Sequence, residues 1–179
     1  MISKHQIPNQ HAGEEIIFHI RRHWFIFFKI FLFFVLLSLV PVALYYLINQ
    51  NMPILLDGNI SYPLILILFL TYYLILLIAL FTAWTETYLD VWTITTDRII
   101  SREQNGLFNR VVSELDLRRV QDVTAEQKGF FPTIFYYGDV YIQSAGEKER
   151  FVFEQIPQPY KIAKIIQQLD EKAKKNSLK

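Results

Sequence analysis

The sequence predicts a membrane α-helical hairpin of two transmembrane helices, followed by a soluble α+β domain: an antiparallel β-barrel or sandwich of about seven strands capped by a C-terminal helix. Three observations predict this fold class. Two apolar runs of about 23–25 residues lie close together in the first half, where about 20 residues suffice to cross a bilayer as a helix. Short β-branched segments separated by turn residues fill the second half. The last segment changes to helical periodicity.

The two apolar runs cover residues 24–48 and 62–84, and only Lys29 is charged within them. Trp24 and Trp84 stand at the edges of the runs, as is typical of the bilayer–water interface. The alternative is a pair of buried helices in a soluble protein, but runs this long with so few polar residues exceed soluble core helices. The first run also starts too late and is too long for a cleaved signal peptide. We therefore expect two retained transmembrane helices.

The charges around the runs predict an orientation. The loop 49–61 contains no Lys or Arg, whereas Arg21 and Arg22 directly precede the first run and the later basic residues all lie within 98–179. The positive-inside rule therefore predicts an extracytoplasmic loop and two cytoplasmic termini in a multi-pass protein of the cell (inner) membrane. Residues 1–23 are expected to form a cytoplasmic N-terminal and interfacial segment, helix or strand.

Residues 85–179 predict one cytoplasmic domain of ordinary size. Asn105-Gly106 suits the tight turn of a β-hairpin, and residues 145–147 supply a second turn. Pro132 interrupts residues 128–137, which therefore predict a loop with some local helix. The predicted strands cover residues 87–95, 98–103, 108–117, 119–126, 139–144 and 150–155.

The last segment has a different period. Ile162, Ile166 and Leu169 recur at helical spacing with lysines on the opposite face, and Pro159 suits a first helical position. These residues predict an amphipathic helix over 160–174 whose isoleucine face closes an open edge of the curled sheet.

Composition and motifs argue against several function classes. The absence of cysteine excludes disulfides and thiolate chemistry, and the net charge of +1 is unlike the basic footprint of a nucleic-acid binder. The sequence lacks a glycine-rich phosphate loop, a Gly-x-Ser-x-Gly elbow and a His-Glu-x-x-His motif. On a helix, Glu15, His19 and His23 would share a face and could hold a metal, but we favour interfacial polar residues. We expect no enzymatic activity, no cofactor and no metal.

The best candidates for a functional surface are basic and aromatic. The connection at residues 86–88 is too short to let the domain leave the bilayer, so basic side chains could meet anionic headgroups at about 1 kcal/mol each, with an aromatic tip dipping in. The open alternative is that these charges pair with Glu103, Glu114 and Asp116. The predicted headgroup- or partner-binding residues are Arg98, Arg102, Arg110, Arg118, Arg119, Lys128, Phe130 and Phe131.

Several short motifs occur along the chain in an order that is typical of a known protein family. They are Gly13-Glu14-Glu15, Arg21-Arg22-His23-Trp24 before the apolar runs, then the segments 92–100, 117–123 and 137–142. This order resembles the bacterial membrane proteins with a bacterial pleckstrin-homology domain, the YdbS-like group formerly catalogued as a domain of unknown function. The resemblance covers nearly the whole chain. It implies the pleckstrin-homology barrel, but no established activity.

Together these features predict a non-enzymatic scaffold or adaptor at the inner membrane face. The expected partners are the lipid bilayer with its anionic lipids, a second copy of the chain, or other membrane proteins, and no nucleic acid. The alternative function is an accessory subunit of a transport or export assembly. Since two helices cannot readily enclose a polar pathway, that alternative requires further subunits.

Overall fold

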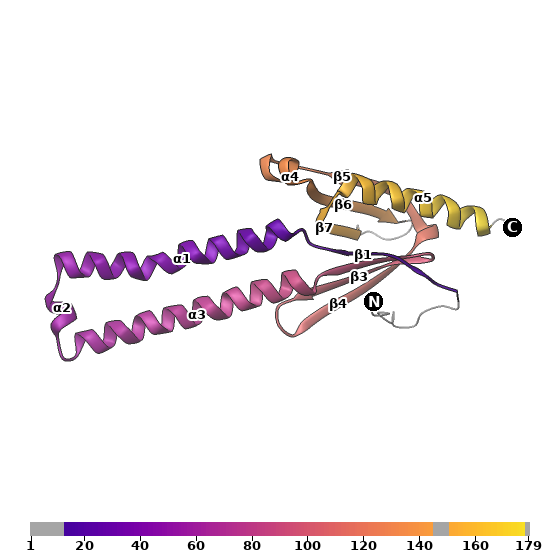
Figure 1. Cartoon of the computed structure of the whole chain (residues 1–179). Coiled ribbons are helices and arrows are strands. Elements are labelled where there is room, and N and C mark those ends of the chain that lie inside the picture. Colours follow the sequence, from indigo (N-terminus) through magenta and orange to yellow (C-terminus); the bar gives the residue numbers. More distant parts are fainter. Residues whose placement is uncertain (1–12, 145–150, 178–179) are drawn as a thin grey trace, which may run out of the picture.

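The computed structural model describes residues 13–144 and 151–177, so the predicted turn at 145–147 lies outside the described residues. Figure 1 shows a long helical hairpin that extends from one end of a β-domain. The hairpin consists of α1 (Trp24–Asn51), the short α2 (Ile54–Asp57) and α3 (Ser61–Leu89).

By length and composition, α1 and α3 could each cross a membrane. Only 17% of the most apolar window of α1 is buried, and none of that of α3, so neither is a core helix of the β-domain. The predicted strand beginning at Thr87 is wrong in its first residues, because α3 continues to Leu89. The Thr87 hydroxyl donates to the carbonyl of Ala83 at 2.8 Å, which lets a β-branched residue sit within the helix.

Tyrosine hydroxyls connect the two long helices. Pro41 lies inside α1 and has no N–H to donate to the carbonyl of Leu37. The Tyr72 hydroxyl of α3 donates to that carbonyl at 2.9 Å, and so replaces the missing helical hydrogen bond. The neighbouring Tyr73 hydroxyl donates to the carbonyl of Ser38, also at 2.9 Å.

Seven strands form two antiparallel sheets. The first sheet has the order β1-β2-β3-β4 and the second the order β5-β6-β7. The first contains β1 (Ile16–Arg21), β2 (Val91–Thr95), β3 (Arg98–Asn105) and β4 (Asn109–Asp116). After the 3-10 turn η1 (Leu117–Arg119), the second contains β5 (Val120–Glu126), β6 (Tyr137–Ser144) and β7 (Phe151–Pro157), with α4 (Phe130–Phe135) between β5 and β6.

The strand β1 precedes the helical hairpin, yet it pairs with β2, which follows it. Ile20 lies opposite Trp92 and Arg21 opposite Val91 in this ladder. The hairpin is therefore inserted between two neighbouring strands of one sheet. Residues Ile16–Arg21 of the expected interfacial segment therefore belong to the same sheet as the expected domain, a pairing that local sequence patterns do not reveal.

The helix α5 (Pro159–Ser177) covers the second sheet, which confirms the predicted closure by a C-terminal helix (Figure 1). Its Ile162 and Ile166 are buried in the same core as Phe153 of β7 and Leu115 of β4. The apolar stripe predicted from helical spacing is thus the stripe that packs against the barrel.

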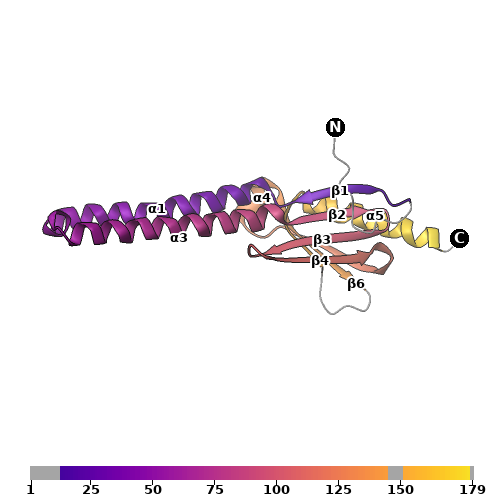
Figure 2. The ribbon, with the colours of Figure 1, turned by 90° about the horizontal axis from the view of Figure 1, so that it is seen from below.

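The barrel has two ends. We call the end joined to α1 and α3 the helix end, and the opposite end, with the β2–β3 turn and η1, the far end. Figures 1 and 2 both place α4 beside the first turns of α1 and the β3–β4 turn beside the last turns of α3. The helix end therefore combines two covalent links with two flanking projections.

Candidate functional site at the helix end of the barrel

Both links between the barrel and the helices are very short. Two residues separate the end of β1 from the start of α1, and one residue separates the end of α3 from the start of β2. Because Arg21 ends β1 and pairs with Val91, which begins β2, the chain leaves the sheet and returns to it at the same place. This geometry fixes the direction in which the barrel extends from the helices.

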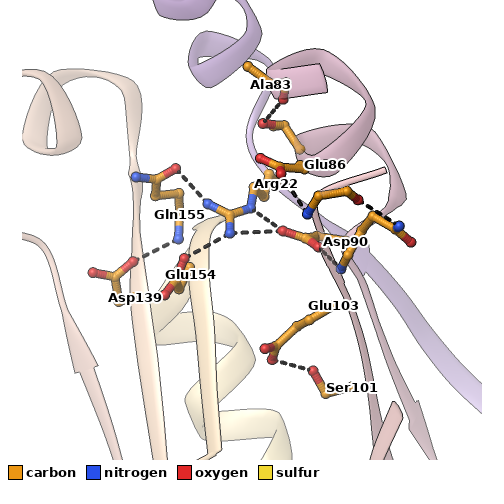
Figure 3. A network of polar contacts seen from close by, with 12 residues as sticks. Arg22, Ala83, Glu86, Asp90, Ser101, Glu103, Asp139, Glu154 and Gln155 are labelled. Atoms are coloured by element: carbon orange, nitrogen blue, oxygen red, sulfur yellow. Dashed lines mark hydrogen bonds and ion pairs between the residues drawn. The ribbon is translucent and has the colours of Figure 1, made fainter. Parts of the chain in front are cut away.

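Arg22, in the first link, forms the centre of a polar network (Figure 3). Its Nε donates to Oδ2 of Asp90 at 2.9 Å, its Nη1 to Oε1 of Gln155 at 3.1 Å and its Nη2 to Oε2 of Glu154 at 2.8 Å. Asp90 is the second link, and the other two residues belong to β7. One guanidinium therefore connects both links to the second sheet. The side chains of Arg22 and Asp90 are only 18% and 6% exposed.

Carboxylates near the end of α3 also hold the β3–β4 hairpin. Oδ1 of Asp90 accepts a hydrogen bond from the backbone N–H of Gln104 at 2.8 Å. Oε1 of Glu86 accepts one from the N–H of Gly106 at 2.7 Å. Gly106 has a φ of 74°, a left-handed value that favours glycine at this turn. The turn is thereby fixed against the helix.

An aromatic cluster fixes α4 to the start of α1. The ring of Phe25 is buried and stacks on Phe135 with the ring centroids 4.3 Å apart. It also lies 5.4 Å from Phe131 and 5.9 Å from Tyr137, and Trp24 meets Phe135 edge-on. Burial raises the pKa of the Tyr137 hydroxyl. Such ring contacts contribute about 0.5–1.5 kcal/mol each beyond area burial.

Two apolar tips project from the helix end, one on each side of the helical pair. The side chain of Phe108 in the β3–β4 turn is 99% exposed, and that of Phe130 in α4 is 73% exposed. Single exposed apolar residues are ordinary, but a cluster at one end of a domain indicates a contact surface. The apolar tips consist of Leu107 and Phe108 on one side and Phe130, Phe131 and Ile134 on the other.

Arg98, one of the predicted binding residues, is buried at the far end. Its Nε and Nη2 donate to the two carboxylate oxygens of Glu14 at 3.0 and 3.1 Å, and its Nη1 to Glu114. The hydrogen bonding that Arg98 donates to Glu14 is the main reason that the pKa of Arg98 is raised. The Thr95 hydroxyl donates to the same Glu14 carboxylate at 2.7 Å. In this chain Arg98 thus has a structural role.

Arg118 and Arg119 also lie at the far end. Arg118 pairs with Asp116 at 2.6 Å, and its hydrogen bonds lower the pKa of that carboxyl. The pairs of Arg98 with Glu114 and of Arg118 with Asp116 support the alternative that these basic side chains pair with nearby acidic residues.

A cavity of about 750 Å³, which we call the far-end cleft, opens at the far end of the barrel. It is lined by Thr96, Asp97, Arg98, Glu114, Asp116, Arg118, Arg119, Leu169, Lys172 and Ala173.

The other predicted residues lie nearer to the helices. Arg110 is exposed opposite Gln104, close to the β3–β4 turn, and Arg102 is half-buried opposite Val91. Lys128 precedes α4 and pairs with Glu126 at 2.6 Å, which raises the pKa of the lysine. The structure thus brings Arg102, Arg110, Lys128, Phe130 and Phe131 to the helix end. Their role in binding stays a prediction.

Sequence reasoning missed the network around Arg22. The pairing partner Asp90 is 68 positions away, and no local pattern connects them. The metal hypothesis assumed that Glu15, His19 and His23 share a helix, but Ile16–Arg21 is a strand. In a strand, residues four apart are separated by about 13 Å, and Nδ1 of His19 lies 3.1 Å from the Thr93 hydroxyl instead.

The chain is similar to a known domain family and to a solved structure. A family model described as "Bacterial PH domain" matches residues 25–170, a range that includes both long helices. The structure is similar to a crystal structure of a DUF1696 family protein with a pleckstrin-homology domain from Shewanella loihica PV-4. The sequence identity is 18% and the TM-score 0.38, and the similarity covers 45% of this chain and 70% of that chain. No curated protein matches the chain.

Proposed function

Because the chain belongs to the bacterial PH domain family, we propose that it is a membrane-anchored binding module without enzymatic activity. Its two long helices cross the inner membrane with both termini in the cytoplasm, and its barrel sits on the inner face of the bilayer. The far end of the barrel is then free to bind a cytoplasmic partner. Membership in a family of pleckstrin-homology domains supports binding over catalysis.

The observation that carries this proposal is the pair of short, clamped links. A domain joined by one flexible linker could turn freely, but this barrel is joined by two links of one and two residues. Arg22 pairs with the buried Asp90 and also bonds to Gln155, and so connects both links to β7. Once the helices are embedded, the two short links require the helix end of the barrel to face the bilayer.

The aromatic residues near the ends of α1 and α3 support a position of the inner bilayer–water interface at the helix end of the barrel. Trp24 and Tyr45 of α1 are separated by about 32 Å at the helical rise per residue, and Tyr62 and Trp84 of α3 by about 33 Å. Both values fit a hydrocarbon core of about 30 Å. Trp24 contacts Phe135, so α4 lies at the level of the inner headgroups.

The apolar tips then supply a second kind of attachment. Burying the exposed part of an aromatic side chain is favourable by about 1–2 kcal/mol. The helix α4, which carries Phe130, and the β3–β4 turn, which carries Phe108, lie on opposite sides of the helical pair (Figure 1), so that together they would brace the barrel against tilting. The helices already hold the barrel at the bilayer. Insertion of the two phenylalanines therefore costs no further loss of overall rotational freedom of the barrel.

The far-end cleft is the surface left open to a partner. Arg119 and Lys172 are exposed in its lining, and neither has an ion pair within residues 13–144 and 151–177. An acidic segment of a cytoplasmic protein would complement them. The variant Arg119→Glu/Lys172→Glu should lose such a partner in a pulldown from native membranes, and Lys164→Glu should retain it. Equal recovery by both variants would argue against the cleft.

The absence of cysteine gives a clean test of topology. A single cysteine at Asn59, in the outer loop, should react with a membrane-impermeant maleimide in intact cells. A single cysteine at Gln168, exposed on α5, should react only after permeabilisation. Labelling of the α5 position in intact cells would overturn the proposal.

An accessory role in transport is the alternative. The faces of α1 and α3 are apolar, and a polar pathway would have to be lined with the help of other subunits. The mass of the detergent-solubilised protein separates the two ideas. A monomer is incompatible with a pore made by copies of this chain.

A further inference from the structure

We propose that the groove between α4 and the start of α5 binds the headgroup of an anionic phospholipid. This inference rests on the proposed function, since the bilayer must supply the ligand. The groove has a volume of about 490 Å³. It is lined by His23, Gln127, Phe135, Tyr136, Pro157, Gln158, Tyr160 and Lys161.

The groove lies at the depth expected for headgroups. His23 is the N-cap of α1 and accepts a hydrogen bond from the backbone N–H of Phe25. The next residue is Trp24, whose ring is 60% exposed at the predicted interface. Phe135, on the other wall, contacts Trp24 with the ring centroids 5.9 Å apart. A lipid beside α1 would therefore have its headgroup next to this groove.

The polar groups of the lining suit an anion. None of the lining residues is acidic, in contrast to the far-end cleft with its three carboxylates. Lys161 is exposed and makes no ion pair with any residue that the structure describes. The hydroxyls of Tyr136 and Tyr160 belong to side chains that are 69% and 60% exposed. A phosphate could accept hydrogen bonds from all three side chains.

The ring of His23 offers a further donor. Its Nδ1 accepts the N–H of Phe25 at 3.3 Å, so the proton of the neutral ring is on Nε2. Burial lowers the pKa of His23, which favours this neutral form. The apolar walls, formed by Phe135 and Pro157, suit the glycerol and upper acyl region of the same ligand. An amphiphilic lipid therefore fits the groove better than a free phosphate.

Backbone strain is concentrated around the groove. In the described part of the chain, the non-glycine residues with positive φ are Tyr136, Gln155 and Gln158, at 52–54°. Two of them line the groove, and the N–H of Gln158 donates to the carbonyl of Tyr136 at 2.8 Å. The third is joined to His23, whose N–H donates to the carbonyl of Gln155 at 2.7 Å. Such conformations cost about 1 kcal/mol or more each and cluster at ligand sites.

Lipid selectivity of the full chain tests the inference. The purified protein in mild detergent is mixed with equal amounts of phosphatidylglycerol and phosphatidylcholine, and native mass spectrometry counts the retained molecules. The wild type should prefer phosphatidylglycerol. Lys161→Gln should reduce this preference about fivefold, the effect of one lysine near an anionic surface. Lys164→Gln is the matched control, an exposed lysine on the same helix outside the groove, and should leave the preference unchanged.

Two further measurements test whether the ligand is a lipid or a free phosphate, and whether the groove causes the lipid preference. Glycerol 3-phosphate at millimolar concentration should not displace the lipid, and displacement would show that the site takes a free phosphate instead. Tyr160→Phe should weaken the preference in the same direction as Lys161→Gln. Equal retention of the two lipids by the wild type, or equal effects of the two lysine variants, would overturn the inference. The cysteine labelling at Asn59 is independent, so failure of the groove leaves the membrane-anchored function standing.

Discussion

The clamp between the links makes a sharp prediction about stability. Replacing Arg22 by methionine keeps a long side chain but removes the charge and all donors. Asp90, which is only 6% exposed, would then keep a buried carboxylate whose remaining donor, among the described residues, is the N–H of Gln104. Gln155 would also lose a partner at 3.1 Å. We expect the barrel of Arg22→Met to be less stable than the wild type.

The size of the effect follows from burial. Removing one partner of a fully buried ion pair costs about 3–5 kcal/mol. Arg22 is partly exposed, Asp90 keeps one hydrogen bond, and Glu154, which is 53% exposed, is solvated again after the change. We therefore expect the low end, about 3 kcal/mol in the free energy of unfolding. For a domain of this size, that corresponds to a decrease of roughly 15 °C in Tm.

The assay is urea unfolding of the full chain in mild detergent, followed by the fluorescence of Trp92, which is buried in the core. Trp24 and Trp84 are replaced by phenylalanine in every variant to isolate this signal. Arg21→Met is the matched control. Its guanidinium lies over the exposed Tyr88 ring at 4.9 Å and should contribute less than about 1 kcal/mol. A loss below about 0.5 kcal/mol for Arg22→Met, or equal losses for the two arginines, would refute the clamp.

Three further predictions concern other parts of the chain. Tyr72→Phe should destabilise the helical pair by about 1 kcal/mol, because Pro41 leaves a carbonyl without a helical donor, and Tyr73→Phe should have a smaller effect. The folded chain holds the pKa of His23 below 6.5, so the unfolded chain binds the proton first, and stability should decrease as the pH falls below 6.5. His23→Asn, which keeps a capping acceptor, should flatten urea midpoints measured between pH 7 and 5. Gly138→Ala should lower Tm markedly, since a Cβ there would stand 2.2 Å from a backbone oxygen of β5.

Local patterns explain much of the fold. The isoleucines of α5 recur every three to four residues, and they are the residues that pack on the barrel. The two apolar runs predict α1 and α3 for a different reason: each is long enough to cross a bilayer as a helix, and Lys29 is the only charged residue within them. By contrast, the six residues of β1 could be read as helix or strand. Their partner β2 lies beyond the whole hairpin, and only the tertiary structure selects the strand.

The candidate site shows the same division. Phe130 and Phe131 could be identified from the sequence, because an aromatic pair in an irregular segment signals an exposed tip. The charge of Arg98 could also be seen, but not its burial against Glu14, which precedes β1. The groove at Lys161 could not be predicted from the sequence, because α4, β7 and α5, which line it, are segments far apart in the chain. The sequence shows which residues are charged, but only the structure shows whether each charged side chain is buried and paired or exposed to a ligand.

Depth-dependent fluorescence quenching shows whether the helix end of the barrel lies against the bilayer. In the background with Trp24 and Trp84 replaced by phenylalanine, single tryptophans are introduced as Phe108→Trp or Phe130→Trp at the apolar tips. Arg119→Trp at the far end is the control. The variants are reconstituted in bilayers that contain lipids brominated near the headgroup end of the acyl chains.

If the barrel lies against the bilayer, both tip tryptophans should be strongly quenched, and the far-end tryptophan should show no quenching beyond the background of the buried Trp92. Tip tryptophans that are quenched no more than the far-end tryptophan would show that the barrel does not contact the membrane, which would overturn the proposed function.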